Sequence, residues 1–167
     1  ILEQLASSQA VLTEDEKELG VCLVDIGGGT TDIAVFVDGA IRHSAVIPIA
    51  GNQVTNDLAV ALRTSTLDAE HLKLTQATAM ADQVNMDMMV EVPGVVDRES
   101  QEVSLQTVSD VVQARYEELF QMVAIELRRS GSYDAVAAGV VLTGGGSKVP
   151  QGVALAERIF ELPTRLA

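Results

Sequence analysis

The sequence predicts an α/β protein built on a mixed five-stranded sheet with flanking helices and a small inserted α+β lobe. Two runs, residues 21–26 and 33–37, are continuously apolar, as expected of strands covered on both faces. The Asp-Gly pair at 38–39 is a hairpin signal that joins the second run to a third strand over 40–47. Another buried strand is predicted at 137–142, and helical spacing dominates much of the chain between.

The composition excludes several functional classes. The 167 residues carry a net charge of −13, so a nucleic-acid backbone is a poor partner. Although 47% of the residues are hydrophobic, their runs fall short of the roughly 20 residues of a membrane span, and we expect a soluble chain. The single cysteine, Cys22, is expected to be a buried structural thiol. The first residues lack a methionine and a basic signal segment, which suggests a piece of a longer protein.

The first half of the chain alternates helices with the predicted strands. Residues 2–12 have helical spacing, with an expected buried face of Leu2, Leu5, Ala6, Gln9 and Leu12. Residues 13–20, "TEDEKELG", are predicted to be an exposed acidic loop that leads into the first strand. A further helix follows Gly51, with Asn52 as its expected cap and an apolar face of Val54, Leu58, Ala61 and Leu62.

In the second half, a short helix is predicted at 68–79, before residues 83–101 change character to an alternating "MMVEVPGVV" and a charged turn. Ser104 is the expected cap of a long helix that runs to Arg129, where two arginines precede Gly131. On this helix Tyr116 and Phe120 are expected to pack onto the sheet. A helix at 153–160 and an edge strand after Pro163 complete the prediction.

Three consecutive glycines, Gly27, Gly28 and Gly29, separate the first two strands. A turn without Cβ atoms lets another group approach the backbone N–H groups closely, which makes it a cradle for an anion. Thr30 and Thr31 would add hydroxyls to the same anion, and Asp32 would brace the turn. Asp25 would repel a bare phosphate. A hydrated cation placed between the carboxylate and the phosphate would convert that repulsion into binding, so the motif predicts Mg²⁺. Taken alone, the turn is equally compatible with an ordinary tight hairpin.

A second glycine run, Gly144, Gly145 and Gly146, follows the buried strand "GVVLT" and precedes a helix. By itself it is compatible with a close strand-to-helix turn. Neither run is a P-loop or a dinucleotide fingerprint, because the first leads into a strand and a Gly-Lys-Ser/Thr sequence is missing. Two such turns that face one ligand predict a nucleotide site.

These motifs carry a family resemblance. "VDIGGGTTD" resembles the second phosphate motif of the actin, sugar-kinase and heat-shock chaperone ATPase superfamily, and "GVVLTGGGSKVPQ" resembles its adenosine motif. Residues 1–59 are closely similar to the FtsA family of bacterial division proteins, and the similarity extends over nearly the whole chain as the second half of an FtsA protein. The resemblance implies an actin-like (ribonuclease H-like) fold, with residues 1–63 and 113–167 as subdomain IIA and residues 64–112 as the inserted subdomain IIB.

The resemblance also implies roles for individual residues. Asp25 would hold the Mg²⁺ water shell, Gly27 to Thr30 would contact the β- and γ-phosphates, and Gly144 to Gly146 would line the adenosine of ATP. "DAEHLKL" resembles the superfamily helix whose Glu and Lys reach ribose and base, which assigns Glu70 and Lys73; the bland alternative is a surface ion pair. Glu3 matches the position that helps to orient the attacking water, although Gln4 replaces the proline that commonly follows it.

For the intact protein, the resemblance implies an actin-like, ATP-dependent polymer that tethers the FtsZ ring to the cytoplasmic face of the inner membrane at the division septum. Its membrane contact would be a C-terminal helix that lies outside this sequence, and other divisome proteins are further expected partners. The small lobe would receive the acidic FtsZ C-terminal tail, with Arg98 and Arg115 as candidate contacts or, alternatively, as ordinary solvated arginines.

The enzymatic expectation is limited. The parent protein would be a weak ATPase, whereas half of a cleft should hydrolyse nothing appreciable on its own, because phosphoryl transfer depends on closure around the phosphates. The alternative is the nucleotide-binding half of another superfamily ATPase, such as an MreB-like or pilus-assembly actin homologue.

Overall fold

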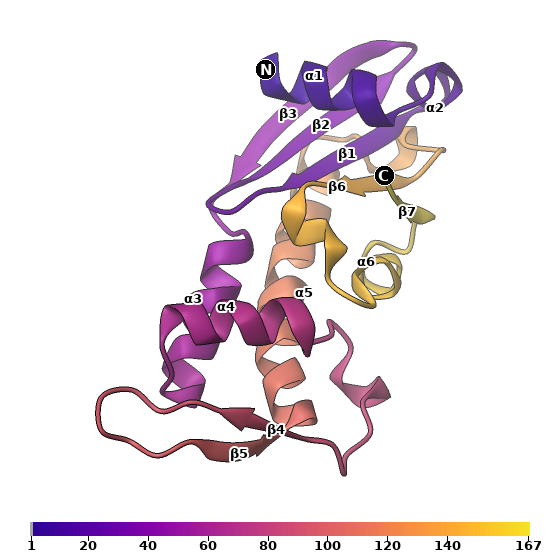
Figure 1. Ribbon diagram of the computed structural model, residues 1–167. Coiled ribbons are helices and arrows are strands. Elements are labelled where there is room, and N and C mark those ends of the chain that lie inside the picture. The colour runs from indigo at the N-terminus through magenta and orange to yellow at the C-terminus, as the bar shows by residue number, and fades with distance from the viewer. Residues whose placement is uncertain (1) are drawn as a thin grey trace.

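A computed structural model describes residues 2–167, and its five-stranded sheet forms the upper part of the molecule in Figure 1. The strand order is β3-β2-β1-β6-β7. The first three strands are antiparallel neighbours, whereas β6 is parallel to both β1 and β7, so the predicted mixed sheet is confirmed. The strands are β1 (Val21–Ile26), β2 (Thr31–Val37), β3 (Ala40–Ile47), β6 (Val140–Thr143) and β7 (Thr164–Leu166).

One face of this sheet carries the main hydrophobic core. It is covered by α3 (Gly51–Leu62), α5 (Leu105–Arg129) and α6 (Gly152–Phe160). The inward residues of β1 on this face, Val24 and Ile26 among them, are fully buried against these helices. Tyr116 and Phe120 pack in the same core, where the Phe120 ring also meets Phe160 with centroids 5.4 Å apart.

The other face of the sheet is covered by α1 (Leu2–Val11) and α2 (Glu14–Leu19). The second helix corrects the prediction of an exposed loop over 13–20. The hydroxyl of Thr13 accepts a hydrogen bond from the Glu16 backbone N–H, and the Glu16 carboxylate accepts one from the Thr13 N–H. This reciprocal capping box starts a helix that the acidic composition concealed.

The buried side of α1 also differs from the prediction. Leu5 is 39% exposed and Ala6 and Gln9 also face solvent, whereas Gln4 and Ser8 are buried. The hydrophobic spacing of the segment therefore does not mark the side that packs on the sheet. Beneath α1, the sheet carries the paired Asp25 and Asp32, and the polar side chains of Ser7 and Gln4 contact them.

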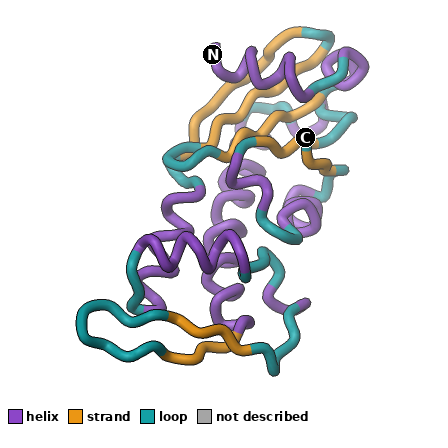
Figure 2. Tube along the Cα trace, in the orientation of Figure 1, coloured by secondary structure: helices purple, strands orange, loops and turns teal. Residues whose placement is uncertain are grey.

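A two-stranded sheet of β4 (Met89–Val92) and β5 (Gln101–Ser104) lies at the opposite end of the molecule, below α4 (Thr66–Thr75). The long connection between the two strands is the teal loop at the lower left of Figure 2. The lower ends of α3 and α5 reach this region, so the predicted boundary at residue 112 falls inside α5. Within residues 2–167, each helix is too short or too polar to cross a membrane.

Several predicted boundaries shift by a few residues. The hydroxyl of Ser65 caps α4 at Asp68, so this helix starts earlier than the predicted residue 68 and ends four residues earlier than 79. The cap of α5 is Ser104, as predicted. Within residues 2–167 there are also three short 3₁₀ turns: η1 (Ala81–Gln83), η2 (Tyr133–Ala135) and η3 (Gly145–Lys148).

Candidate functional site

The two glycine turns lie side by side at one edge of the sheet. Because β1 and β6 are parallel neighbours, with Asp25 opposite Thr143, both strands deliver their turns to the same edge. Gly144 has φ +85°, and a Cβ placed there would lie 2.5 Å from the Ile26 carbonyl oxygen. A Cβ on Gly146 would lie 2.4 Å from the Ile26 side chain. These two glycines therefore permit a close approach that a larger residue would prevent.

The first turn of α3 completes this edge. Its backbone N–H groups at Gly51 and Asn52 donate to the carbonyls of Gly27 and Gly28 at 3.0 and 2.8 Å. The helix thus begins at Gly51, one residue before the predicted cap. Instead, the Asn52 side chain lies against Gly28, 3.3 Å from the place of a Cβ. The first turn of α3 therefore holds the carbonyl groups of the glycine turn, and Gly27 and Gly28 also line a cavity.

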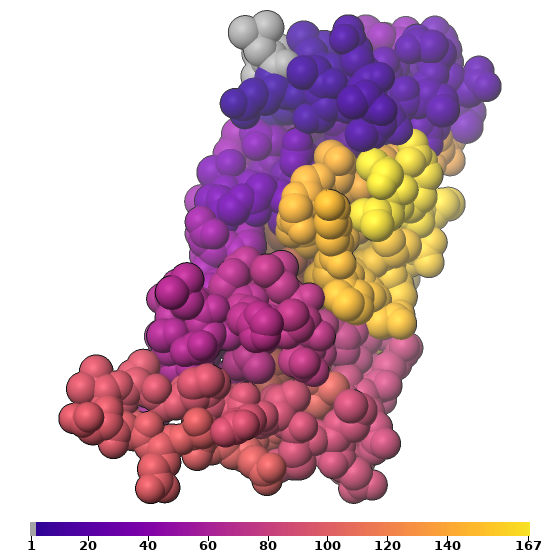
Figure 3. Space-filling model, in the orientation of Figure 1, coloured from indigo at the N-terminus to yellow at the C-terminus, as the bar shows by residue number. Residues whose placement is uncertain are grey.

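A cavity of about 460 Å³ opens beside the two turns. It lies where η3 and the following residues, in orange, approach α4, in magenta (Figure 3). Both glycine turns, the start of α3, and α4 and α5 contribute to its wall. The lining residues are Gly27, Gly28, Gly51, Asn52, Glu70, Lys73, Leu74, Tyr116, Gly145, Gly146, Lys148, Val149 and Pro150.

Glu70 and Lys73 reach this cavity from α4 and form an ion pair at 2.8 Å. The Lys73 ammonium group also donates to the Gly51 carbonyl at 3.1 Å and to the Thr55 hydroxyl at 2.8 Å, and the same hydroxyl contacts Glu70. Burial alone would raise the pKa of Glu70, but the hydrogen bonds from Lys73 and Thr55 lower it below the ordinary value. The pair is therefore charged and tied to α3, unlike a free surface ion pair.

Tyr116 forms the floor of the cavity. Its hydroxyl donates to the Gly146 carbonyl at 2.7 Å, which ties the second glycine turn to α5. Burial, together with the nearby Glu70 carboxylate, raises the pKa of Tyr116 to about 12, so the hydroxyl remains a donor. The packing role expected for Tyr116 is present, and the hydrogen bond to the turn is an addition.

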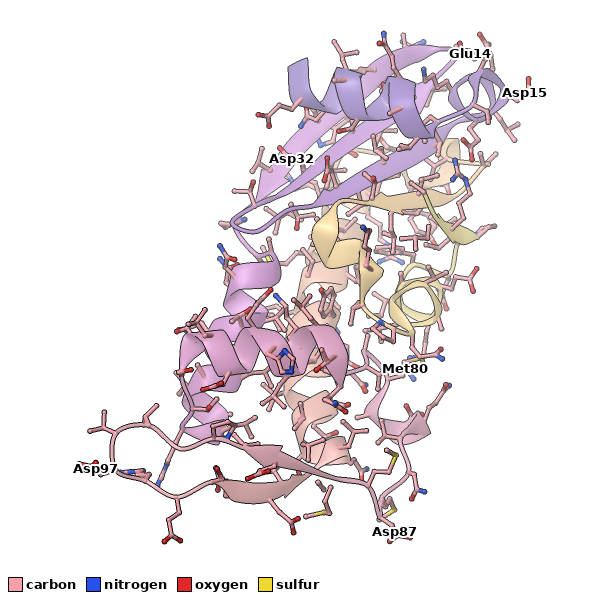
Figure 4. All side chains as sticks on the ribbon, in the orientation of Figure 1. Glu14, Asp15, Asp32, Met80, Asp87 and Asp97 are labelled. Atoms are coloured by element: carbon pink, nitrogen blue, oxygen red, sulfur yellow. The ribbon has the colours of Figure 1, made fainter. Side chains whose placement is uncertain are left out.

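Asp25 lies beneath the turns and contacts two different elements. Its Oδ2 accepts a hydrogen bond from the Ser7 hydroxyl of α1 at 3.0 Å, and its Oδ1 lies 2.5 Å from the place of a Cβ on Gly144. Asp32 is directly opposite Asp25 in the β1–β2 pair, and Figure 4 shows it on the strand next to α1. It accepts from the Gln4 side chain, so its predicted contact with the turn is replaced by one with α1.

Not every predicted residue reaches the cavity. Gly29 and Thr30 are exposed at the tip of the β1–β2 turn. The Thr31 hydroxyl is buried and donates to the Ile49 carbonyl at 2.7 Å, which corrects its expected contact with an anion. Glu3 is exposed on α1, whereas its neighbours Gln4 and Ser7 reach the two aspartates.

The two candidate partner arginines lie in different environments. Arg98 is exposed in the β4–β5 connection, beside Asp97 at the lower left of Figure 4. Arg115 makes two hydrogen bonds to the Asp57 carboxylate of α3, at 2.6 and 2.9 Å, and one to Glu118. The hydrogen bonds with Asp57 raise the pKa of Arg115. Its guanidinium group thus joins α5 to α3 rather than standing free.

Several residues that build the site are not predicted by the motifs of the sequence. Asn52 was assigned to a helix cap, and Lys148, Leu74 and the Ser7 contact were not assigned at all. A usable signal was present only for Ser7, because the polar residues Gln4, Ser7 and Ser8 recur at helical spacing in the segment predicted to be a helix. Asn52, Leu74 and Lys148 reach the cavity because α3, α4 and η3 converge in space, which local spacing does not encode.

The fold and its paired turns define the class of actin-like ATPase folds. MreB 5 of Spiroplasma citri, in a structure bound to AMPPNP, superimposes with a TM-score of 0.80 and 25% identity, over 96% of this chain and 52% of that one. The ethanolamine utilization protein EutJ of Carboxydothermus hydrogenoformans gives a TM-score of 0.70 at 20% identity, over 98% and 48% of the two chains.

Sequence comparison then identifies the family. The profile described as cell division protein FtsA matches residues 22–167, and the chain belongs to that family. The cell division protein FtsA of Pseudomonas aeruginosa is 61% identical over 166 residues, and that of Escherichia coli K12 is 47% identical over 173 residues. Each match covers 99% of this chain, which spans about 40% of the length of those relatives.

Proposed function

We propose that this chain supplies one wall of an ATP site in a longer FtsA-family protein. The observation that carries the proposal is the shared cavity, because two glycine turns far apart in the sequence and the Glu70–Lys73 pair line the same space. Backbone N–H groups at such turns suit phosphate oxygens, and Lys148, which also lines the cavity, offsets their charge in a chain of net charge −13. MreB 5, which has the same fold, is described in complex with AMPPNP.

The residues around Asp25 fit a hydrated Mg²⁺ ion. Two carboxylates that face each other across a strand pair repel one another unless donors or a cation offset the charge. Beside them, the buried Oε1 of Gln4 lacks a hydrogen-bond donor among residues 2–167, and a water of a cation's shell would provide one. Bound Mg²⁺ would neutralise phosphate charge, and Asp25 would hold its water shell.

Substitutions in the longer protein test the nucleotide site. Gly145 faces open space within 4 Å, so an Asp there adds a negative charge to the cavity without a steric clash. Gly145→Asp and Asp25→Ala should each weaken the binding of a fluorescent ATP analogue about tenfold or more, as measured by anisotropy. Gly145→Asn, which is similar in size but neutral, is the control for bulk. Unchanged affinity in both test variants would contradict the site.

For the whole protein, we propose the family role: an actin-like polymer at the cytoplasmic face of the inner membrane that tethers the FtsZ ring at the septum, with membrane attachment and other divisome contacts made outside this chain. We also propose that residues 64–112 form subdomain IIB and receive the FtsZ tail. The exposed Arg98 and the exposed methionines Met86, Met88 and Met89 support this, because they offer charge and adaptable apolar surface.

Titration of the FtsZ C-terminal peptide tests the tail site. Arg98→Glu should weaken binding several-fold, because it reverses a charge beside an acidic peptide. Arg42→Glu is the matched control, since Arg42 is also an exposed arginine but lies on β3 at the other end of the molecule. Equal affinity of the two variants, or chemical-shift changes that avoid residues 64–129, would exclude the proposed lobe as the receptor.

A further inference from the structure

Helix α1 places a small polar cluster against the sheet at the edge where both glycine turns emerge. Ser7 donates to Asp25 at 3.0 Å, and the Gln4 amide nitrogen lies 3.4 Å from the Asp32 carboxylate. The two donors are three residues apart and so share one side of the helix. This side meets the two carboxylates that face each other across β1 and β2.

Gln4 is buried and Ser7, Asp25 and Asp32 are half-buried, at a place where an apolar helix face would stabilise the fold more simply. Gln4 is 6% exposed, although the neighbouring apolar Leu5 is 39% exposed. Burial of an amide with one unpaired oxygen costs stability, so this arrangement is not explained by packing. Apolar packing resumes further along this face, where Leu12 meets Val21 and Leu23 of β1.

The contacts on Asp25 leave its carboxylate little freedom. One oxygen is held by Ser7 on α1, while the other lies against Gly144 of the second turn. A carboxylate that must face a hydrated cation gains from such preorganisation, because its orientation need not be fixed at the moment of binding.

We propose that Ser7 and Gln4 are positioning residues for the cation: Ser7 orients Asp25, and Gln4 holds Asp32 while its free Oε1 accepts from a water of the cation's shell. The inference rests on the proposed function of Asp25. It moves the contribution of α1 from Glu3, which is exposed, to the two residues that contact the carboxylates.

The test uses the longer protein and measures the Mg²⁺ concentration needed for half-maximal binding of a fluorescent ATP analogue. Ser7→Ala should raise that concentration about tenfold or more, the usual effect of losing one hydrogen bond to a charged group. Ser7→Thr keeps the hydroxyl and should restore the wild-type Mg²⁺ concentration. Ser8→Ala is the matched control, because Ser8 is 1% exposed but its hydroxyl donates to the Leu5 carbonyl within α1. Gln4→Leu should shift the concentration in the same direction as Ser7→Ala, by less, because its contact is longer.

A merely structural role predicts a different pattern. The positioning role is wrong if Ser7→Ala and Ser8→Ala need the same Mg²⁺ concentration for half-maximal binding. It is also wrong if Ser7→Ala weakens analogue binding equally with Mg²⁺ and in EDTA. If Ser7→Ala does not fold, the proposal is tested with Gln4→Leu and Ser7→Thr. A wild-type Mg²⁺ dependence in Gln4→Leu then overturns it. Asp25→Ala is measured in parallel. If this variant leaves the Mg²⁺ dependence of binding unchanged, the proposed cation site itself is wrong. If the Mg²⁺ dependence shifts in Asp25→Ala but not in the variants of Ser7 and Gln4, only the role of α1 is wrong.

Discussion

The two faces of the five-stranded sheet are built differently. Under α3, α5 and α6, an extensive apolar core runs from β1 to Phe120 and Phe160. Under α1 and α2, a core of six buried residues gives way to Gln4, Ser7 and the two aspartates. The large face stabilises the fold, and the small face can therefore tolerate polar groups at the edge where the glycine turns lie.

The largest expected effect is the loss of unfolding free energy when a phenylalanine on each face is replaced by alanine. Phe120→Ala should cost about 4 kcal/mol, because the ring is fully buried and contacts both Tyr116 and Phe160. Phe36→Ala should cost about 3 kcal/mol, because its smaller cluster can collapse more readily into the space that the ring leaves. Urea unfolding of the two variants measures the difference. A larger loss for Phe36→Ala would reverse the assignment of the stabilising face.

A second comparison separates packing from nucleotide contact within the large face. Tyr116 and Tyr133 each donate to a backbone carbonyl, at 2.7 Å to Gly146 and 2.6 Å to Phe160. Phenylalanine at either position should cost about 1 kcal/mol of stability. Only Tyr116→Phe should also weaken binding of the ATP analogue, about fivefold, because only this hydroxyl fixes a glycine turn. Equal affinities in the two variants would remove Tyr116 from the site.

The small face depends on an ion pair for part of its stability. Arg165 of β7 donates twice to Glu16 of α2, at 2.7 and 2.9 Å, and this bonding is the main cause that lowers the pKa of Glu16 from 4.5 to about 2. Since the folded pKa is the lower one, the contribution is present above pH 4.5 and is lost as the pH falls towards 2. We expect about 1 kcal/mol, because Arg165 is 42% exposed and solvent screens the pair.

The measurement is the pH dependence of the melting temperature. Glu16→Gln should be less stable than the wild type at pH 7, and the difference should shrink on acidification. Glu14→Gln serves as the control, since Glu14 pairs only with Lys17 and its side chain is 86% exposed. A pH-independent difference between Glu16→Gln and the wild type would assign the loss to packing.

The smallest effect is expected at Cys22, which faces the large core. Burial raises the pKa of its thiol to about 12, so the native chain should not react with a disulfide reagent at pH 8. Rapid labelling under native conditions would show that the large face opens easily, and the proposed difference between the faces would then lose its basis.

Sequence reasoning predicted the elements of this fold better than their contacts. The strands of the main sheet and the Ser104 cap could be predicted because continuous apolar runs, a hairpin turn and a capping residue are local signals. Helix α2 was missed because its acidic composition resembles an exposed loop. The two glycine turns were found as motifs, but the roles of Asn52 and Tyr116 near them depend on tertiary packing. Thr31 was misassigned because the side to which a strand residue points is set by the register with its neighbours.

Helix α5 begins at Leu105, directly after β5, and continues without a break to Tyr116 in the wall of the cavity and beyond. Tyr116 and Leu105 lie at two points of this one rod, about 16 Å apart at a rise of 1.5 Å per residue. Helix α5 thus joins the wall of the cavity to the β4–β5 sheet through one continuous element.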